Sequence, residues 1–256
     1  PMNRFEDRTI LVTGAGSGIG QATVARLLAE GGTVLAADIS EAGLAETRKR
    51  AEAAGHAARL TTLVADVSSE DSVRDAIGKA IETAGSLDVL VNAAGILRSE
   101  HTHKTTLDFW NRMLAINLTG TFLVTRECLP ALLRSGRGVV VNFSSTSASF
   151  AHPYMAAYAA SKGGIQAFTH TIALEYAKQG LRAVSVCPGS IQSGMTNDPG
   201  LPADADMMLF AKMSPALMGG GFAGPENIAS AIAMFASDDG KFITGTELRI
   251  DGGTHM

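Results

Sequence analysis

The sequence is poor in cysteine and tryptophan and has no long apolar run. Two cysteines and one tryptophan occur among its 256 residues. Cys128 and Cys187 stand alone, without a CxxC or Cys/His spacing, so we expect neither a disulfide framework nor a metal site. No segment reaches the roughly 18 uninterrupted apolar residues of a membrane helix, and the residues up to Asp7 lack the apolar region of a signal peptide. A membrane-spanning or exported protein is therefore disfavoured, and a reducing, cytoplasmic setting fits best.

The sequence also lacks a strong excess of charge of either sign. It has 21 Lys and Arg against 25 Asp and Glu, a net charge of −4, and its only notable basic tract is the short run Arg48–Arg50. Neither a nucleic acid nor an anionic membrane is therefore an expected partner. A hydrophobic fraction of 46% with 18% charged residues excludes a disordered chain and indicates a substantial core.

Short apolar runs alternate with longer stretches of helical periodicity. Each run is followed by a turn signal, which is typical of repeated strand–helix units. Most runs are continuously apolar, as expected where helices cover both faces of a parallel sheet. We therefore predict an α/β protein with a doubly wound, seven-stranded parallel sheet and helices on both faces, a Rossmann fold. The predicted strands are Thr9–Val12, Thr33–Asp38, Thr61–Asp66, Leu87–Asn92, Gly138–Phe143, Arg182–Cys187 and Glu247–Ile250.

No linker or change of composition divides the chain, so a single domain is predicted. Because Pro1 precedes Met2, we interpret Pro1 as an added residue and place the domain at 2–256. The irregular stretch is about 190–224, which contains three prolines and the run Gly219–Gly221. It is too long for an ordinary connection, so we expect a substrate lid that includes a short helix.

The lid is rich in apolar side chains, which favours an apolar or mixed substrate because methionines adapt to irregular shapes. Core packing or an oligomer contact would explain them about as well. These residues are Met207, Met208, Leu209, Phe210, Met213, Leu217 and Met218.

A glycine-rich turn follows the first predicted strand and precedes a helix. Gly14, Gly18 and Gly20 give the spacing Gly-x-x-x-Gly-x-Gly, with Ser17 and Ile19 between them. Glycines here allow a tight turn and let backbone N–H groups approach a pyrophosphate at the positive end of the helix. A turn that simply requires positive φ would look similar, so the motif alone is weak evidence.

An acidic residue ends the second predicted strand. Asp38 lies 18 residues after Gly20, where a carboxylate can accept hydrogen bonds from an adenosine ribose. It would repel a 2′-phosphate, and neither Ser17 nor Ile39 is basic, so NAD is predicted as the cofactor in preference to NADP. The alternative role, a helix cap, competes with Ser40, which can supply that cap.

The third and fourth predicted strands end in further candidate cofactor contacts. Both ends lie at the carboxyl edge, where doubly wound sheets bind ligands. Asp66, followed by Val67, is expected to bind the adenine amino group unless it caps the next helix. The small residues after the fourth strand let the backbone close on the cofactor, although a plain turn would look similar. They belong to the run Asn92, Ala93, Ala94 and Gly95.

Tyr158 and Lys162 carry the most specific chemical signal. They are four residues apart in a stretch with helical spacing, hence on one face of one helix. A phenol with a pKa of about 10 is a poor base at neutral pH, and a neighbouring ammonium would lower that pKa toward the range of general acid–base catalysis. Tyr154 is a rival, but its partner four residues on is Tyr158. In isolation, an incidental surface pair is the alternative.

Two serines, Ser144 and Ser145, follow the fifth predicted strand at the same edge. A hydroxyl there can donate to a substrate oxygen while a tyrosine transfers the proton, although two serines after a strand can also be a simple turn. The nearby Phe150, His152 and Met155 are further candidates for the wall of the site.

Taken together, these motifs resemble the short-chain dehydrogenase/reductase superfamily over essentially the whole chain. The resemblance is carried by the glycine turn, Asn92–Gly95, Asn117, Ser145, Tyr158-x-x-x-Lys162 and Pro188-Gly189. It implies a nicotinamide-dependent oxidoreductase whose catalytic serine lies thirteen residues before the tyrosine, which selects Ser145 over Ser144. Asn117 stands where the family's fourth catalytic residue helps to hold a water for the proton relay, with a helix kink or a structural amide as the alternative.

The resemblance also implies contacts around the nicotinamide. Lys162 would contact the nicotinamide ribose, and Pro188, Gly189 and Ile191 would border the nicotinamide. Ser193 stands where the family often has a threonine that bonds the carboxamide. Val184 departs from the family, which often has an asparagine there, and this puts the usual support of the Pro-Gly turn in doubt. The terminal strand resembles one that the family commonly buries in a homotetramer.

We therefore predict reversible hydride transfer between a secondary alcohol or ketone and NAD(H), without a metal. The predicted catalytic residues are Asn117, Ser145, Tyr158 and Lys162. Sugar, steroid, acyl-thioester and small diol substrates all remain open. One alternative is a 3-oxoacyl-thioester (acyl-carrier-protein) reductase using NADPH, which Asp38 argues against. The other is a non-catalytic nucleotide-sensing scaffold, which the intact set of Ser145, Tyr158 and Lys162 argues against.

Overall fold

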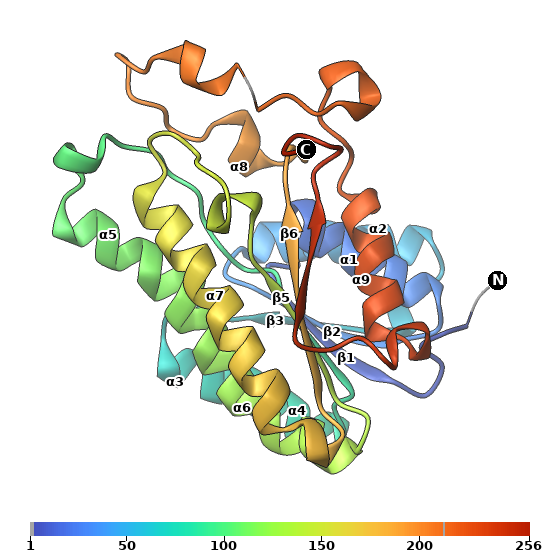
Figure 1. The fold of residues 1–256 in the computed structure, drawn as a ribbon. Coiled ribbons are helices and arrows are strands. Elements are labelled where there is room, and N and C mark those ends of the chain that lie inside the picture. The colour runs from blue at the N-terminus through green and yellow to red at the C-terminus, as the bar shows by residue number, and fades with distance from the viewer. Residues whose placement is uncertain (1–2, 212) are drawn as a thin grey trace.

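The predicted strands form one parallel sheet. The computed structural model describes residues 3–211 and 213–256, so Met2, the predicted start of the domain, lies outside the described residues. The strand order is β3-β2-β1-β4-β5-β6-β7 and every neighbouring pair is parallel (Figure 1), which confirms the doubly wound fold. The strands are β1 (Thr9–Thr13), β2 (Thr33–Asp38), β3 (Leu60–Val64), β4 (Val89–Asn92), β5 (Val139–Phe143), β6 (Arg182–Pro188) and β7 (Thr246–Ile250).

The strand ends differ from the prediction by at most two residues, and β3 shows why. It was expected to continue to Asp66 but ends at Val64. Because β3 lies at the sheet edge and pairs only with β2, it stops where β2 stops, with Asp38 opposite Val64. Asp66 instead forms a turn, in which its Oδ1 accepts hydrogen bonds from the backbone N and the Oγ of Ser68 at 2.9 and 2.7 Å. The helix cap that follows is Ser69, not Asp66.

Helices cover both faces of the sheet (Figure 1). One face carries α1 (Gly18–Ala29), α2 (Glu41–Ala53) and α9 (Glu226–Ala236). The other carries α4 (Lys79–Ala84), α5 (Leu107–Leu114), α6 (Gly120–Ser135) and α7 (Ala156–Glu175). Short helices α3 (Glu70–Ser72) and α8 (Gly194–Asn197) lie in connections, and π-helical turns span Val73–Gly78 and Ala115–Thr119. In the described part of the chain, no helix combines the length and the apolar character needed to cross a membrane.

The sheet separates two apolar cores, because successive side chains of a strand point to opposite faces. In β1, Ile10 and Val12 belong to the core beneath α1 and α9, whereas Leu11 between them belongs to the core beneath α6 and α7. The central strands are buried on both sides, which explains their continuous apolar sequences.

A buried polar network crosses the second core and fixes two helices against two strands. The Asn92 amide of β4 donates to Asn142 Oδ1 of β5 at 2.8 Å and to Thr125 Oγ1 of α6 at 3.0 Å. The Asn142 amide in turn donates to Thr169 Oγ1 of α7 at 2.9 Å. All four side chains are buried. Since a buried polar group is costly unless it is paired, this network sets the position of α7 relative to β5.

The segment 190–224 lies beyond the carboxyl ends of the strands, above β6 in Figure 1. It contains the expected short helix, α8, and two 3₁₀ turns, Met207–Phe210 and Leu217–Gly220. Several hydrogen bonds tie it to the body: for example, Ser99 N donates to Pro199 O at 3.0 Å, His101 contacts Asp204 at 2.8 Å, and Asp206 N donates to the Tyr154 hydroxyl at 2.8 Å.

The buried network makes a stability prediction. Thr169→Val removes the acceptor of the Asn142 amide and leaves a buried donor without a partner, so we expect the free energy of unfolding to fall by about 1–3 kcal/mol. Thr171→Val is the matched control, because that hydroxyl lies on the exposed side of the same helix, and it should change stability by less than about 0.5 kcal/mol. Urea denaturation measures both. Equal losses in the two variants would contradict the account.

Candidate active site

A cleft of about 850 Å³ opens at the carboxyl ends of the strands. It is lined by residues from the turn after β1, the ends of β2 to β6, α7, the segment 190–224 and the C-terminal residues. It brings together all of the predicted site residues except Asn92 and Asn117. Those lining the cleft are Gly14, Ser17, Gly18, Ile19, Gly20, Asp38, Asp66, Val67, Ala93, Ala94, Gly95, Ser145, Tyr158, Lys162, Pro188, Gly189, Ile191 and Ser193.

The glycine turn packs too closely for side chains at two positions. A Cβ on Gly14, which has φ of +66°, would lie 2.8 Å from the backbone of Ala93, and one on Gly20 would lie 2.0 Å from the Gly14 carbonyl oxygen. Helix α1 begins directly after this turn, and its N-cap residue Ser17 makes no side-chain capping bond. The first N–H groups of a twelve-residue helix therefore face the cleft, an arrangement that suits a phosphate.

Asp38 is held at the rim of the cleft by two backbone hydrogen bonds. Gly16 N donates to Oδ2 and Ser40 N donates to Oδ1, both at 2.8 Å. The cap of α2 is Ser40, whose Oγ accepts from Gly43 N at 3.0 Å, so capping does not account for Asp38. Each carboxylate oxygen retains a lone pair that can accept a hydroxyl of a ligand.

Ser145, Tyr158 and Lys162 meet in the middle of the cleft. Ser145 follows β5 and caps a 3₁₀ turn, its Oγ accepting from Ser147 N at 3.1 Å. Ser144 also lines the cleft, but its hydroxyl donates to the Lys162 carbonyl at 3.0 Å. The Lys162 ammonium is buried, donates to the Phe143 carbonyl at 2.9 Å, and lies 5.5 Å from the centre of the Tyr158 ring.

The pKa of Tyr158 shifts in the direction opposite to the one expected from the sequence. Burial raises the pKa of the Tyr158 phenol, and Ser145 is the group that opposes this shift. The expectation that Lys162 lowers the phenol pKa is therefore wrong for this geometry, in which the ammonium lies beside the ring and bonds a backbone carbonyl. Burial also lowers the pKa of Lys162 to about 8, because desolvation penalises its charged form.

Asn117 lies behind the cleft wall and is fully buried. Its Oδ1 accepts from Ile96 N at 2.8 Å, and its Nδ2 donates to Ile96 O at 3.0 Å and to Ser161 Oγ at 3.1 Å. It lies within the π-helical turn Ala115–Thr119. A Cβ on Gly95 would lie 3.0 Å from Asn117 Oδ1 and 3.5 Å from Lys162 Nζ, so Asn117 holds the loop after β4 next to the lysine.

The side chain of Asn92, which was predicted to contact a cofactor, does not line the cleft. Its buried side chain points into the polar network between β4, β5, α6 and α7. The residues that follow it, Ala93 to Leu97, reach the cleft instead.

The segment 190–224 and the segment after Ser145 complete the wall. Of the apolar residues in 190–224, Met207, Phe210 and Met213 line the cleft, whereas Met208 and Leu217 are largely exposed, and the side chain of Met218 lies outside the described residues. His152 and Met155 line the cleft as expected, but Phe150 instead stacks on His255.

Sequence reasoning missed Thr146, Thr254 and His255, which also line the cleft. Thr146 directly follows Ser145, so proximity in the sequence was a usable signal for it. The two C-terminal residues carried no such signal, because their place depends on how the chain turns after β7.

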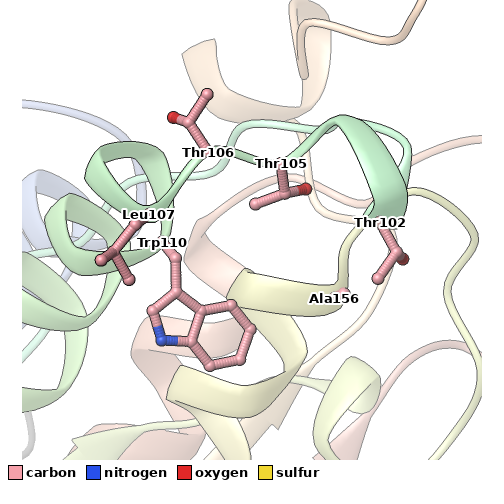
Figure 2. Close-up of a pocket in the computed structure, with 6 residues that line it drawn as sticks. All are labelled: Thr102, Thr105, Thr106, Leu107, Trp110 and Ala156. Atoms are coloured by element: carbon pink, nitrogen blue, oxygen red, sulfur yellow. The ribbon is translucent and has the colours of Figure 1, made fainter.

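A second, smaller hollow of about 340 Å³ lies between the start of α5 and the start of α7. Figure 2 shows the Trp110 indole beside Leu107, three threonines and Ala156. None of its six lining residues is titratable, so it is not a candidate for acid–base chemistry. Across 3–211 and 213–256, no group of three or more His, Cys, Asp or Glu side chains is arranged to hold a metal ion.

Comparison with known proteins identifies relatives over the whole chain. Residues 14–255 match the family described as enoyl-(acyl carrier protein) reductase. The chain is 37% identical to 2-(S)-hydroxypropyl-CoM dehydrogenase 3 of Xanthobacter autotrophicus over 251 residues, with 98% of each chain covered. It is 38% identical to cis-4-hydroxycyclohexanecarboxylate dehydrogenase of Sinomonas cyclohexanicum over 251 residues, with 97% of each chain covered.

Solved structures give the same likeness. A 3-ketoacyl-(acyl-carrier-protein) reductase from Brucella melitensis, complexed with NADH, superposes with a TM-score of 0.86 at 26% identity. The match covers 98% of this chain and 99% of that one.

Proposed function

Because the chain belongs to the short-chain dehydrogenase/reductase superfamily, and both relatives named above are dehydrogenases of hydroxylated compounds, we propose that it is an NAD(H)-dependent oxidoreductase of secondary alcohols and ketones. The observation that carries this proposal is the meeting of Ser145, Tyr158 and Lys162 in the same cleft as the glycine turn and Asp38.

The cleft fits a dinucleotide by its own geometry. The turn at Gly14 and Gly20 leaves room for backbone but not for a Cβ, and it presents the N-terminus of α1. Asp38 lines the cleft and would bind the adenosine ribose. Asp66 and Val67 also line the cleft, and they would lie beside the adenine. Pro188, Gly189, Ile191 and Ser193 would border the nicotinamide, which, when bound, supplies or accepts the hydride.

The chain's own residues handle the proton and the substrate oxygen. In reduction, the Tyr158 hydroxyl donates its proton to the carbonyl oxygen, and in oxidation the phenolate takes the hydroxyl proton. Ser145 donates a hydrogen bond to the same oxygen and holds it in place. Lys162 would bind the nicotinamide ribose from its position beside the Tyr158 ring. Asn117 serves as a positioning residue, since it holds the loop that contains Gly95 beside Lys162.

The preference for NAD rests on the negative charge and position of Asp38. A 2′-phosphate would approach this carboxylate, and the neighbouring Ile39 offers no positive charge. The runner-up function is a 3-oxoacyl-thioester reductase, which the Brucella melitensis relative favours by name, although that relative is complexed with NADH. A non-catalytic nucleotide sensor is disfavoured because it would not require the serine, tyrosine and lysine together.

We also propose that the protein assembles as a homotetramer through β7. This edge strand has three exposed residues, among them Leu248, and the Phe242 side chain just before it is fully exposed. Burying such an edge removes unpaired backbone groups and apolar surface from water.

Cofactor titration tests the role of Asp38. The wild type should bind NADH at least tenfold more tightly than NADPH, a difference of about 1.4 kcal/mol or more. Asp38→Asn should erase most of that preference because it removes the charge, as measured by cofactor fluorescence. Asp66→Asn is the matched control, since it should alter the affinities for both nucleotides alike. A wild type that prefers NADPH would refute the NAD assignment and promote the thioester reductase.

Removal of the phenolic oxygen tests catalysis. Tyr158→Phe should lower kcat in both directions by about 10²–10⁴-fold, because the proton has no other carrier, while NADH binding is retained. Tyr176→Phe, the same change at the far end of α7, should leave kcat unchanged. A Tyr158→Phe enzyme with wild-type turnover of secondary alcohols would rule out the acid–base role.

The raised pKa of Tyr158 predicts that alcohol oxidation and ketone reduction depend on pH in different ways. The phenol keeps its proton at pH 7, so ketone reduction has its acid in place. Alcohol oxidation needs the phenolate, whose fraction rises about tenfold per pH unit below the pKa. The kcat/KM for oxidation should therefore climb steadily between pH 7 and pH 9, while that for reduction does not rise. An oxidation profile that is flat over this range would count against Tyr158 as the base.

A further inference from the structure

The C-terminal residues fold back into the cleft and are held there firmly. After β7, the Asp251 carboxylate accepts backbone hydrogen bonds from Gly253 at 3.0 Å and from His255 at 3.2 Å, which closes a tight turn. Asp251 is itself buried and lies directly behind Gly189, where a Cβ would come within 2.5 Å of the Asp251 Cβ. The tail is thus fixed against the same Pro-Gly turn that lines the cleft.

The His255 ring is clamped in a defined orientation. It stacks on Phe150 with ring centres 4.3 Å apart and an interplanar angle of 3°. The Arg249 guanidinium also lies over the Phe150 ring, 5.1 Å from its centre, and its Nε is 3.5 Å from Asp251 Oδ2. Phe150, Arg249 and Asp251 therefore support the imidazole from outside, and none of these three lines the cleft.

His255 presents a polar atom that the protein leaves unpaired. Its Nε2 is buried and has no hydrogen-bond partner among the described residues, although His255 lines the cleft. A buried nitrogen is unfavourable unless it is paired, and a ligand group that reaches the ring from the cleft would supply a partner.

A second imidazole, that of His152, lies next to His255 and also lines the cleft. The His152 ring centre is 5.4 Å from that of His255, and His152 Nε2 lies 3.2 Å from Thr146 Oγ1. Thr146 directly follows Ser145, and both imidazoles line the same cleft as Ser145 and Tyr158. The wall of the cleft also includes the apolar Met155, Phe210 and Met213, together with polar residues such as Arg112 and Ser214.

We propose that His255, together with His152, hydrogen-bonds a second hydroxyl or carbonyl group of the substrate and so selects hydroxyketones and diols over simple ketones and alcohols. This inference rests on the proposed function and names the substrate class of the same site. Burial and the neighbouring His255 lower the pKa of His152 to about 4, so His152 is uncharged at neutral pH and suits a neutral polar group rather than an anion.

Matched ketones test the inference, because the members of each pair differ only by a hydroxyl next to the carbonyl. The pairs are 2-butanone with 3-hydroxy-2-butanone, cyclohexanone with 2-hydroxycyclohexanone, and acetophenone with 2-hydroxyacetophenone. With NADH, the wild type should reduce at least one hydroxylated member with a kcat/KM tenfold or more above its partner.

His255→Phe keeps the stacking on Phe150 but removes the ring nitrogens. It should lower the preference for the hydroxylated ketone about tenfold, mainly by raising the KM for that ketone. NADH binding should be unchanged, which also shows that the variant is folded. His103→Phe is the matched control, because His103 is exposed and does not line the cleft, and it should retain the full preference.

Two results would overturn the inference while leaving the proposed function intact. One is a wild type that reduces the ketones of each pair equally well. The other is a His255→Phe variant that keeps the wild-type preference. Failure of the wild type to reduce any of the six ketones with bound NADH would instead contradict the proposed function, and this inference with it.

Discussion

The candidate site depends on how α7 is fastened to the end of β5. The Lys162 ammonium donates to the Phe143 carbonyl at 2.9 Å, and the Ser144 hydroxyl donates to the Lys162 carbonyl at 3.0 Å, so two hydrogen bonds join the helix and the strand end in opposite directions. Deeper in the core, the Asn142 amide donates to the Thr169 hydroxyl. Asn142 is the residue before Phe143 on β5, and Thr169 lies two helical turns after Lys162 on α7. With α7 fixed in this way, Ser145 and Tyr158 are brought into one cleft although they belong to different elements.

The parallel sheet supplies the other half of the arrangement. Because all seven strands run the same way, every strand end delivers its loop to one edge, and that edge collects the glycine turn, Asp38, the loop after β4 and the Pro188-Gly189 turn. Close approach of these loops requires small residues where they meet, as at Gly14 against Ala93 and Gly189 against Asp251. The close contact between Gly189 and Asp251 also brings the residues after Asp251 to the cleft, where Thr254 and His255 line its wall.

The elements that could be predicted were those whose signal is local. Continuous apolar runs revealed the strands, and the four-residue spacing of Tyr158 and Lys162 placed both on one helical face. What could not be predicted depends on neighbours distant in the sequence. Strand β3 ends where its neighbour β2 ends. The Asn92 side chain forms hydrogen bonds with residues of β5 and α6. His255 reaches the cleft because the chain turns at Asp251. The direction of the Tyr158 pKa shift likewise follows from burial, which the spacing of tyrosine and lysine does not reveal.

In the proposed reaction, a hydride moves between nicotinamide and a substrate carbon in this cleft while Tyr158 moves the proton. The most direct measurement is reduction of a ketone with NADH deuterated at both hydrogens of its reactive ring carbon, followed by mass spectrometry and NMR of the alcohol. The account predicts one deuterium on the new carbinol carbon in ordinary water, and none on that carbon when unlabelled NADH is used in heavy water. Deuterium that enters the carbinol carbon from the solvent, or a product that carries no label from the cofactor, would contradict it.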